Sequence, residues 1–136
     1  MLVIGPVVVH LWAASDCPDT DFAAKLIEVG PDGLAQNLCY GIMRARFRKG
    51  FDKQVLLDPG VPQEYVIPMM QVGIRFKKGS RIRLDIASSD FPNFDRNHNT
   101  GRDFWSDPEL RVARQTVFHD PRHPSRIVLP VIPEKA

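Results

Sequence analysis

The residue types that could perform chemistry are present in this sequence, but their spacing matches no catalytic motif. A serine hydrolase of the α/β type places its serine in a Gly-x-Ser-x-Gly turn between a strand and a helix. The Walker A and dinucleotide-binding glycine motifs are absent. We therefore predict no catalytic residue in this chain. The serines, none of which has the required glycine neighbours, are Ser15, Ser80, Ser88, Ser89, Ser106 and Ser125.

Metal binding is the next chemistry to test. His119 and His123 have the i, i+4 spacing of a helical zinc site, but Pro121 and Pro124 rule out a helix between them. No third strong ligand accompanies them, so we interpret both histidines as polar groups that tie a turn to its neighbours. We predict no metal site and no cofactor.

Aspartates gather in two segments and leave one alternative open. Hard oxygen ligands of this kind could hold calcium, although the spacing is not that of an EF-hand loop. Aspartates also close turns by accepting backbone hydrogen bonds, which is the interpretation we favour. The two groups are Asp16, Asp19 and Asp21, and Asp90, Asp95 and Asp103.

Residues 89–107 form a long polar segment that contains Phe91, Phe94, Phe104 and Trp105. A loop of this length inside a compact domain usually has a function or docks on a partner. Its aromatic rings could cap the domain's own core, pack on a neighbouring domain or stack on sugars. The first two readings stand about equal, and sugar binding ranks below them.

The elements that must position these residues are β-strands. Apolar residues mostly alternate with polar ones, and Gly, Pro and Asp signals interrupt them every ten or so residues, which is typical of a sandwich or jelly roll. Gly30–Gly33 is predicted to be a tight turn, and Pro68 places its strand at a sheet edge or a bulge. The predicted strands are residues 7–13, 22–29, 34–38, 42–48, 65–69, 81–88, 113–119 and 125–132.

Composition narrows the class of protein further. The 136 residues suit one domain, and a net charge of +2 argues against a nucleic-acid-binding domain. No apolar run approaches the roughly 20 residues of a membrane span, and no signal peptide is recognisable. Cys17 and Cys39 lack Cys-x-x-Cys spacing and indicate reduced thiols in a cytoplasmic protein, with a single disulfide between them as the alternative.

Several segments in order resemble one family. They are Ser15-Asp16-Cys17-Pro18-Asp19-Thr20-Asp21-Phe22, then residues 29–33 and 41–48, then residues 76–84 and 88–101, and finally residues 123–130. The pattern is similar to the C-terminal non-catalytic domain of the X-Pro dipeptidyl-peptidase and cocaine esterase hydrolases, which include α-amino-acid ester hydrolases and glutaryl acylases. The resemblance covers nearly the whole chain.

The resemblance implies an all-β, galactose-binding-like jelly-roll β-sandwich that packs against an α/β-hydrolase domain and helps to shape its acyl pocket. The Ser-Asp-His triad would lie in that other domain, outside this chain. The partner expected is therefore the parent chain's catalytic domain, with no nucleic acid and no membrane. The residues that we expect to face it are Asp19, Thr20, Asp21, Phe22, Asn93, Phe94, Asp95, Arg96 and Asn97.

Two departures from the family pattern lead to further expectations. The chain opens at Leu2 almost in its first strong strand, so residues 1–136 are expected to be one domain that lacks a first strand, and the unpaired edge invites a homodimer. His98 replaces a proline that is common in the family, which would make its loop less rigid. A free-standing carbohydrate-binding module is the alternative function, and a small metal-dependent enzyme is a third.

Overall fold

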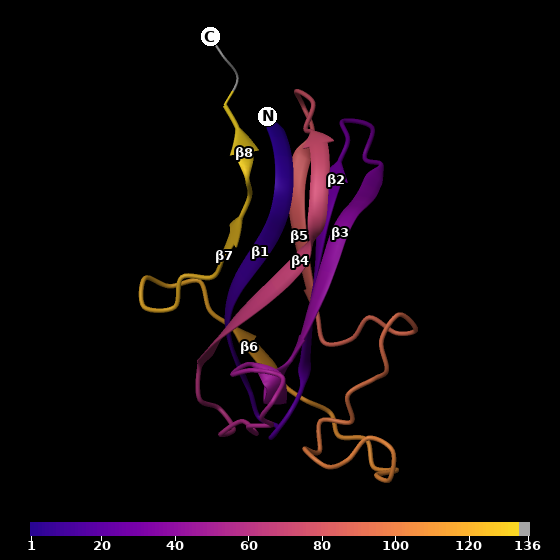
Figure 1. Cartoon of the computed structure of the whole chain (residues 1–136), viewed down its shortest axis with the longest axis vertical. Coiled ribbons are helices and arrows are strands. Elements are labelled where there is room, and N and C mark those ends of the chain that lie inside the picture. The colour runs from indigo at the N-terminus through magenta and orange to yellow at the C-terminus, as the bar shows by residue number, and fades with distance from the viewer. Residues whose placement is uncertain (134–136) are drawn as a thin grey trace.

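The computed structural model describes residues 1–133 and shows two antiparallel sheets packed face to face (Figure 1). One sheet has the order β4-β1-β6, with β7 and β8 also paired to β1, and the other has the order β3-β2-β5. The predicted all-β sandwich is confirmed. The strands are β1 (Leu2–Ser15), β2 (Asp21–Val29), β3 (Ala35–Arg44), β4 (Gln63–Arg75), β5 (Arg81–Ala87), β6 (Gln115–Val117), β7 (Arg126–Val128) and β8 (Val131–Ile132).

Strand β1 organises the first sheet. It pairs with β4 from Leu2↔Arg75 to Ala13↔Gln63 and, along its other edge, with the three short C-terminal strands. Its side chains alternate, so one set points into the sandwich and is almost fully buried. These inward residues are Val3, Val7, Val9, Leu11 and Ala13.

Apolar side chains from both sheets fill the space between them. Phe22 and Leu26 of β2 meet Tyr65 and Ile67 of β4, and all four are nearly inaccessible to solvent. The rings of Phe22 and Tyr65 lie with their centroids 4.6 Å apart. The core is therefore continuous between the two central layers, as the alternating sequence pattern predicted.

The structure corrects the predicted strand over residues 42–48. Strand β3 is one continuous strand that covers residues 35–38 of the predicted 34–38 segment and ends at Arg44. A single 3₁₀ turn, Ala45–Phe47, follows it. The ladder stops because the next two backbone N–H groups bond elsewhere. The Ala45 N–H donates to the Thr20 carbonyl oxygen at 2.8 Å, and the Arg46 N–H donates to the Asp19 carboxylate at 2.9 Å.

Other boundaries also shifted. The strand predicted at residues 65–69 runs from Gln63 to Arg75, and β4 lies at the edge of its sheet, as Pro68 predicted. The predicted strand 113–119 shortens to β6, and the predicted strand 125–132 divides into β7 and β8 around Pro130, which has no N–H to donate. The predicted tight turn is present, with the Gly33 N–H donating to the Gly30 carbonyl oxygen at 2.9 Å.

Three connecting segments gather at one end of the sandwich, at the bottom of Figure 1. They are residues 16–20, 45–62 and 88–114, and we call this region the loop end. The segments touch: a Cβ on Gly101 would lie 3.2 Å from the Pro18 side chain and 3.3 Å from the Leu56 side chain. Residues 88–114 contain no strand or helix, so the loop end must be held together by side chains.

Candidate docking site at the loop end

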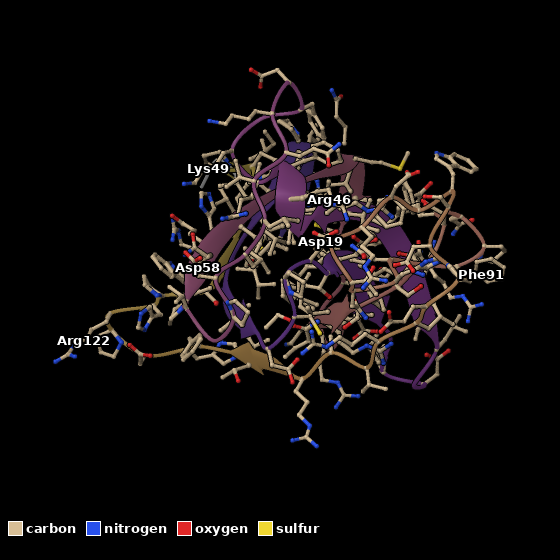
Figure 2. All side chains as sticks on the ribbon, turned by 90° about the horizontal axis from the view of Figure 1, so that it is seen from below. Asp19, Arg46, Lys49, Asp58, Phe91 and Arg122 are labelled. Atoms are coloured by element: carbon tan, nitrogen blue, oxygen red, sulfur yellow. The ribbon has the colours of Figure 1, made fainter. Side chains whose placement is uncertain are left out.

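A buried ion pair lies at the centre of the loop end, as the view from below shows (Figure 2). Asp19, between β1 and β2, is fully buried, and Arg46, in the 3₁₀ turn, is 4% exposed. The Arg46 Nε–H donates to Asp19 Oδ2 at 2.7 Å, and the Arg46 backbone N–H donates to Asp19 Oδ1 at 2.9 Å. Both carboxylate oxygens are therefore engaged by one residue located 27 positions away in the sequence.

A second pair lies beside the first. Arg44 bonds Asp21 in a bidentate manner, with Nε–Oδ1 and Nη2–Oδ2 distances of 3.0 Å each. Burial raises the pKa of the Asp21 carboxyl above its usual value, and the hydrogen bonds from Arg44 and Asn97 offset only part of this effect. Arg44 also reaches Asp95, at 3.2 Å, and so links β3 to the long loop.

Asn97 joins the two pairs. Its side-chain amide donates to Asp19 Oδ2 at 2.9 Å and to Asp21 Oδ1 at 2.7 Å, and its Oδ1 accepts the Asn99 backbone N–H at 2.9 Å. The side chain is 9% exposed. We call Asp19, Asp21, Arg44, Arg46 and Asn97 the arginine–aspartate cluster. Because Asn97 belongs to the long loop, the cluster fastens that loop to the sheets.

An aromatic ring covers the cluster. The Phe104 ring centroid lies 4.0 Å from Cζ of Arg44 and 4.6 Å from Cζ of Arg46. Cations are attracted to the faces of aromatic rings at such distances. The Arg46 Nη2–H also donates to the Arg102 carbonyl oxygen at 3.0 Å. The second half of the loop is thus anchored at the same place as the first.

The arginine–aspartate cluster can hold the long loop in place, but it offers no free reactive group. The carboxylates of Asp19 and Asp21 are engaged by arginine and asparagine donors, and no nucleophile accompanies them. Removing one partner from such a buried pair typically costs about 3–5 kcal/mol, because the other charge is left unpaired in a dry environment. We infer that the cluster fixes the shape of the loop that it holds.

The structure brings together the two segments that we expected to face another domain, but it buries one of them. The side chains of Asp19, Thr20, Asp21 and Phe22 are at most 1% exposed. Asp19 and Asp21 bond within the arginine–aspartate cluster, the Thr20 hydroxyl accepts a hydrogen bond from the Gln115 side chain at 2.6 Å, and Phe22 packs in the core. Asp19–Phe22 thus cannot offer side-chain contacts on the surface of this domain, while the expectation that the loop end faces a hydrolase domain stays a prediction.

The second segment predicted to face another domain, residues 93–97, is mostly open to solvent. Asn93, Asp95 and Arg96 are exposed, Phe94 is half-buried against Tyr40, and Asn97 is buried in the cluster. The start of this segment is fixed by an ion pair of Lys25 with Asp90, and the Lys25 ammonium lowers the pKa of Asp90.

Sequence reasoning found only part of the apolar surface at the loop end. Trp105, which is 95% exposed, belongs to the aromatic segment that the sequence singled out, whereas Val112, 85% exposed, and Phe51, 82% exposed, were not singled out. Sequence reasoning also missed the roles of Arg44 and Arg46, which it placed only in the strand predicted over residues 42–48. The only available signal was the pairing of two Asp positions and two Arg positions with the same two-residue spacing.

The other residues considered as nucleophiles or metal ligands make ordinary structural contacts. Ser125 Oγ donates to the Phe118 carbonyl oxygen at 2.6 Å, and the His123 ring lies between Trp12 and Phe118 and bonds Asp120 at 3.0 Å. Within residues 1–133, no three His, Cys, Asp or Glu side chains gather closely enough to hold a metal ion. Both cysteines are buried and free, and burial raises the pKa of each thiol.

Two antiparallel sheets packed face to face and a loop end fastened by Arg–Asp ion pairs define an all-β sandwich domain. The comparison with known families is consistent with this class. Residues 1–128 match the X-Pro dipeptidyl-peptidase C-terminal non-catalytic domain, and the chain belongs to this family. In the described part, no helix is long and apolar enough to cross a membrane.

Similar proteins are larger hydrolases. The chain is 41% identical over 132 residues to the cocaine esterase of Rhodococcus sp. (strain MB1 Bresler), covering 96% of this chain and 23% of that protein. An aminopeptidase from a marine sediment Thaumarchaeota archaeon superposes with a TM-score of 0.92 at 34% identity, covering 97% of this chain and 24% of that one. An α-amino acid ester hydrolase gives a TM-score of 0.92 at 30% identity, covering 96% and 23%. This chain thus spans about a quarter of the length of each.

Proposed function

We propose that this domain is the C-terminal accessory part of a serine hydrolase that cleaves esters or amides, and that its loop end docks on the α/β-hydrolase domain. The family match and the one-quarter coverage of an esterase, an ester hydrolase and an aminopeptidase support the class of parent enzyme. In this proposal, the chain is inactive alone and acts in the cytoplasm, where its two buried thiols stay reduced.

The exposure of large apolar side chains is the observation that supports the loop end as the docking surface. Large apolar side chains stand almost fully exposed there, on segments that the arginine–aspartate cluster holds in place. Exposed apolar side chains that form a patch mark interaction sites on soluble proteins, and a partner gains most from a surface whose conformation is already fixed. The exposed apolar residues on the loop-end segments are Phe51, Leu56, Val61, Phe91, Trp105, Leu110 and Val112.

The proposed contribution to the reaction is positional. The parent reaction would be attack of a serine on an ester or amide, followed by hydrolysis of the acyl-enzyme. Docking of the loop end beside the active site would shape the acyl pocket and exclude water from it, which strengthens the electrostatic interactions inside. None of these steps uses a residue of this chain as a catalytic group.

A domain exchange tests the proposal. The matching quarter of the Rhodococcus cocaine esterase is replaced with this chain, and esterase activity and thermal stability are measured. We expect an active chimera, and a Trp105→Ser/Val112→Ser variant that loses activity or stability. The matched control is Leu34→Ser, since Leu34 is 68% exposed in the turn at the opposite end of the sandwich.

Two results would contradict the proposal. One is an active chimera that is equally indifferent to the loop-end variant and to the control. The other is turnover of p-nitrophenyl esters or X-Pro amides by this chain alone that serine-directed reagents inhibit.

A carbohydrate-binding module is the second candidate, and the exposed Trp105 ring is the observation that favours it. Aromatic side chains on the surface of a sandwich can stack on sugar rings. Glycan-array binding by the isolated chain that disappears in Trp105→Ala would support this alternative over domain docking. Phe94, which packs against Tyr40, is a less accessible ring for the same role.

A further inference from the structure

The outer faces of the two sheets differ in charge. On the three-stranded sheet, Lys25 and Asp85 lie opposite each other on the side that points away from the core. Arg83 lies on the same side, with its Nε 3.0 Å from Oδ1 of Asp85. On the five-stranded sheet, the outward side chains of β1 between Leu2 and Val8 are all apolar. Only the first of these two faces has the polar character that a sheet shows towards water.

Strand β1 is apolar on both of its faces. Its inward side chains are buried in the core, and its first titratable residue is His10. A strand with an almost continuous apolar run is typical of a sheet that is covered on both sides. Ile4, which points outward, is nevertheless 52% exposed. The outward residues before His10 are Leu2, Ile4, Pro6 and Val8.

Neighbouring strands extend this apolar surface on both sides of β1. Residues directly opposite each other in antiparallel strands share a face. Val8 has Pro68 of β4 on one side and Val128 of β7 on the other. Val128 is 47% exposed, and Ile132, which pairs with Leu2, is 42% exposed. We use the term outer apolar face for Leu2, Ile4, Pro6, Val8, Val66, Pro68, Val128 and Ile132.

Polar side chains border the outer apolar face on the side of the loop end. His10 Nδ1 lies 3.0 Å from Glu64 Oε1, and Arg126 Nη1 lies 3.6 Å from the same oxygen. Val66, opposite His10, is 46% exposed at this border. An apolar centre with a polar rim is the usual anatomy of a protein interface.

This chain itself covers the part of the sheet beyond that border. Trp12 is the next outward residue of β1 after His10, and it is only partly exposed. The turn after β6 places His123 against it, with ring centroids 5.1 Å apart. The same side of the sheet is thus covered near the loop end and open over the outer apolar face.

The family and the position of the N-terminus indicate which partner covers the open part. The family is named for a C-terminal domain, and this chain spans about a quarter of each larger relative. Polypeptide that precedes β1 would reach the domain at Leu2, which belongs to the outer apolar face and lies beside β8 (Figure 1). Permanent interfaces are more hydrophobic than transient ones, which suits a partner on the same polypeptide.

We propose that the outer apolar face packs against an apolar surface of the parent enzyme's polypeptide that precedes β1. The covering surface has few charges at its centre, because a charge placed against Ile4 or Val8 would lose water without gaining a counterion. Opposite His10, Glu64 and Arg126 it can be polar. The inference rests on the proposed function, because it requires a parent enzyme, but it uses a surface separate from the loop end.

Thiol labelling tests whether the face is covered. Cys17 and Cys39 are buried, so an introduced surface thiol reports its own exposure. Val66→Cys and Val128→Cys are compared in the isolated chain and in the chimera in which this chain replaces the matching quarter of the cocaine esterase. Both introduced thiols should react at least about tenfold more slowly in the chimera. The matched control, Leu34→Cys at the exposed turn, should react at the same rate in both proteins.

A Val112→Cys variant separates this inference from the proposed function. Val112 is 85% exposed at the loop end, so its labelling reports loop-end docking alone. Slower labelling of Val112→Cys in the chimera, without any change for Val66→Cys and Val128→Cys, would support loop-end docking and overturn the present inference. Slower labelling of Val66→Cys and Val128→Cys alone would support the present inference and contradict loop-end docking.

Stability provides a second measurement. Val8→Thr/Val128→Thr keeps both side chains β-branched and adds two hydroxyl groups, so the isolated chain should stay folded by circular dichroism with an unchanged unfolding temperature. In the chimera the same change should lower the unfolding temperature, because the hydroxyl groups would be buried without partners. Leu34→Thr is the control and should change neither protein.

Three results would overturn the proposal. The first is equally fast labelling of Val66→Cys and Val128→Cys in the isolated chain and in the chimera. The second is labelling that slows in the isolated chain as its concentration rises, which would assign the face to a second copy. The third is a Val8→Thr/Val128→Thr chimera that is as stable as the unchanged chimera.

Discussion

The loop end and the body of the sandwich are held together by different forces. In the body, Val, Leu, Ile and Phe side chains from two sheets fill a continuous apolar core. At the loop end, two Arg–Asp pairs with buried carboxylates, together with Asn97 and Phe104, fasten a segment that has no secondary structure of its own. Many interchangeable apolar contacts stabilise the body of the sandwich, whereas a few charged groups with fixed geometry stabilise the loop end.

This difference has a consequence for mutation. Apolar cores tolerate a change in one contact because their neighbours adjust, and the cost follows the volume removed. A buried ion pair fails abruptly, because the partner that remains is a charge without a counterion. The comparison can therefore be tested with single substitutions whose effects differ in size and in location.

Arg46→Ala should have the largest effect. It leaves the Asp19 carboxylate buried without its counterion, so we expect a loss of about 3–5 kcal/mol in the free energy of unfolding. Chemical denaturation measures it. Hydrogen exchange should show the first loss of protection in residues 88–114. The control is Arg102→Ala, since Arg102 is 66% exposed in its pairs with Glu109 and Asp107, and its removal should cost less than about 1 kcal/mol. Equal losses in the free energy of unfolding for Arg46→Ala and Arg102→Ala would contradict the claim that the buried pair is what stabilises the loop end.

Leu26→Ala should weaken the body instead. Leu26 is fully buried at the centre of β2, and a cavity of this kind costs about 3 kcal/mol. The loss of hydrogen-exchange protection should spread through both sheets. Leu34→Ala, at an exposed turn position, should change stability by less than about 0.5 kcal/mol. Loss of protection confined to the loop end would show that the two regions are not held separately.

Tyr65 offers a pH test of the core next to the loop end. Burial raises the pKa of Tyr65 to about 12, and its hydroxyl makes no hydrogen bond within residues 1–133. The unfolded chain releases this proton near pH 10, while the folded chain retains it. Stability is therefore full below pH 10 and is lost as the pH rises towards 12, by up to about 2.7 kcal/mol. Tyr65→Phe should lose less stability than the unchanged chain over that range, measured by denaturation at each pH, and equal slopes would refute the assignment.

Phe104→Leu should have the smallest effect. It keeps an apolar side chain over Arg44 and Arg46 but removes the ring face that attracts both guanidinium groups, at a cost of about 1 kcal/mol. Phe91→Leu is the control, because its ring is exposed and its single arginine, Arg96, lies farther away, at 5.6 Å. Thermal unfolding of both variants distinguishes a ring that secures the loop from one that merely covers it.

Much of the body could be predicted because its signals are local. An apolar run at residues 7–13 and alternation at residues 81–88 identified β1 and β5. The Gly30–Gly33 segment marked the hairpin turn, and Pro68 marked a strand at an edge or a bulge. The prediction over residues 42–48 was wrong because its pattern continues past the point where the ladder ends. Carbonyl and carboxylate acceptors of Thr20 and Asp19 remove the N–H groups of Ala45 and Arg46 from that ladder, and no local pattern encodes them.

The loop end was predicted only in part for a similar reason. Asp19, Asp21 and Asn97 were selected through a family resemblance as residues that face another domain, and the structure buries all three side chains within this domain. Asn97 reaches Asp19 and Asp21 across 78 and 76 residues of sequence. Which aspartate is buried and which is exposed depends on where the loop returns, and composition alone gives the same prediction for all of them.

The sequence by itself determined an all-β sandwich, the place of its turns, the absence of a nucleophile motif and the family. Period-two alternation, glycine and proline act over a few residues, so the local sequence is enough to predict the strands and turns. Only the tertiary structure decided which arginine neutralises which aspartate, which apolar side chains stand exposed at the loop end and which outer sheet face is apolar and open to solvent. These properties depend on distances between segments far apart in the chain, and burial, charge pairing and edge pairing have no meaning until folding has set those distances.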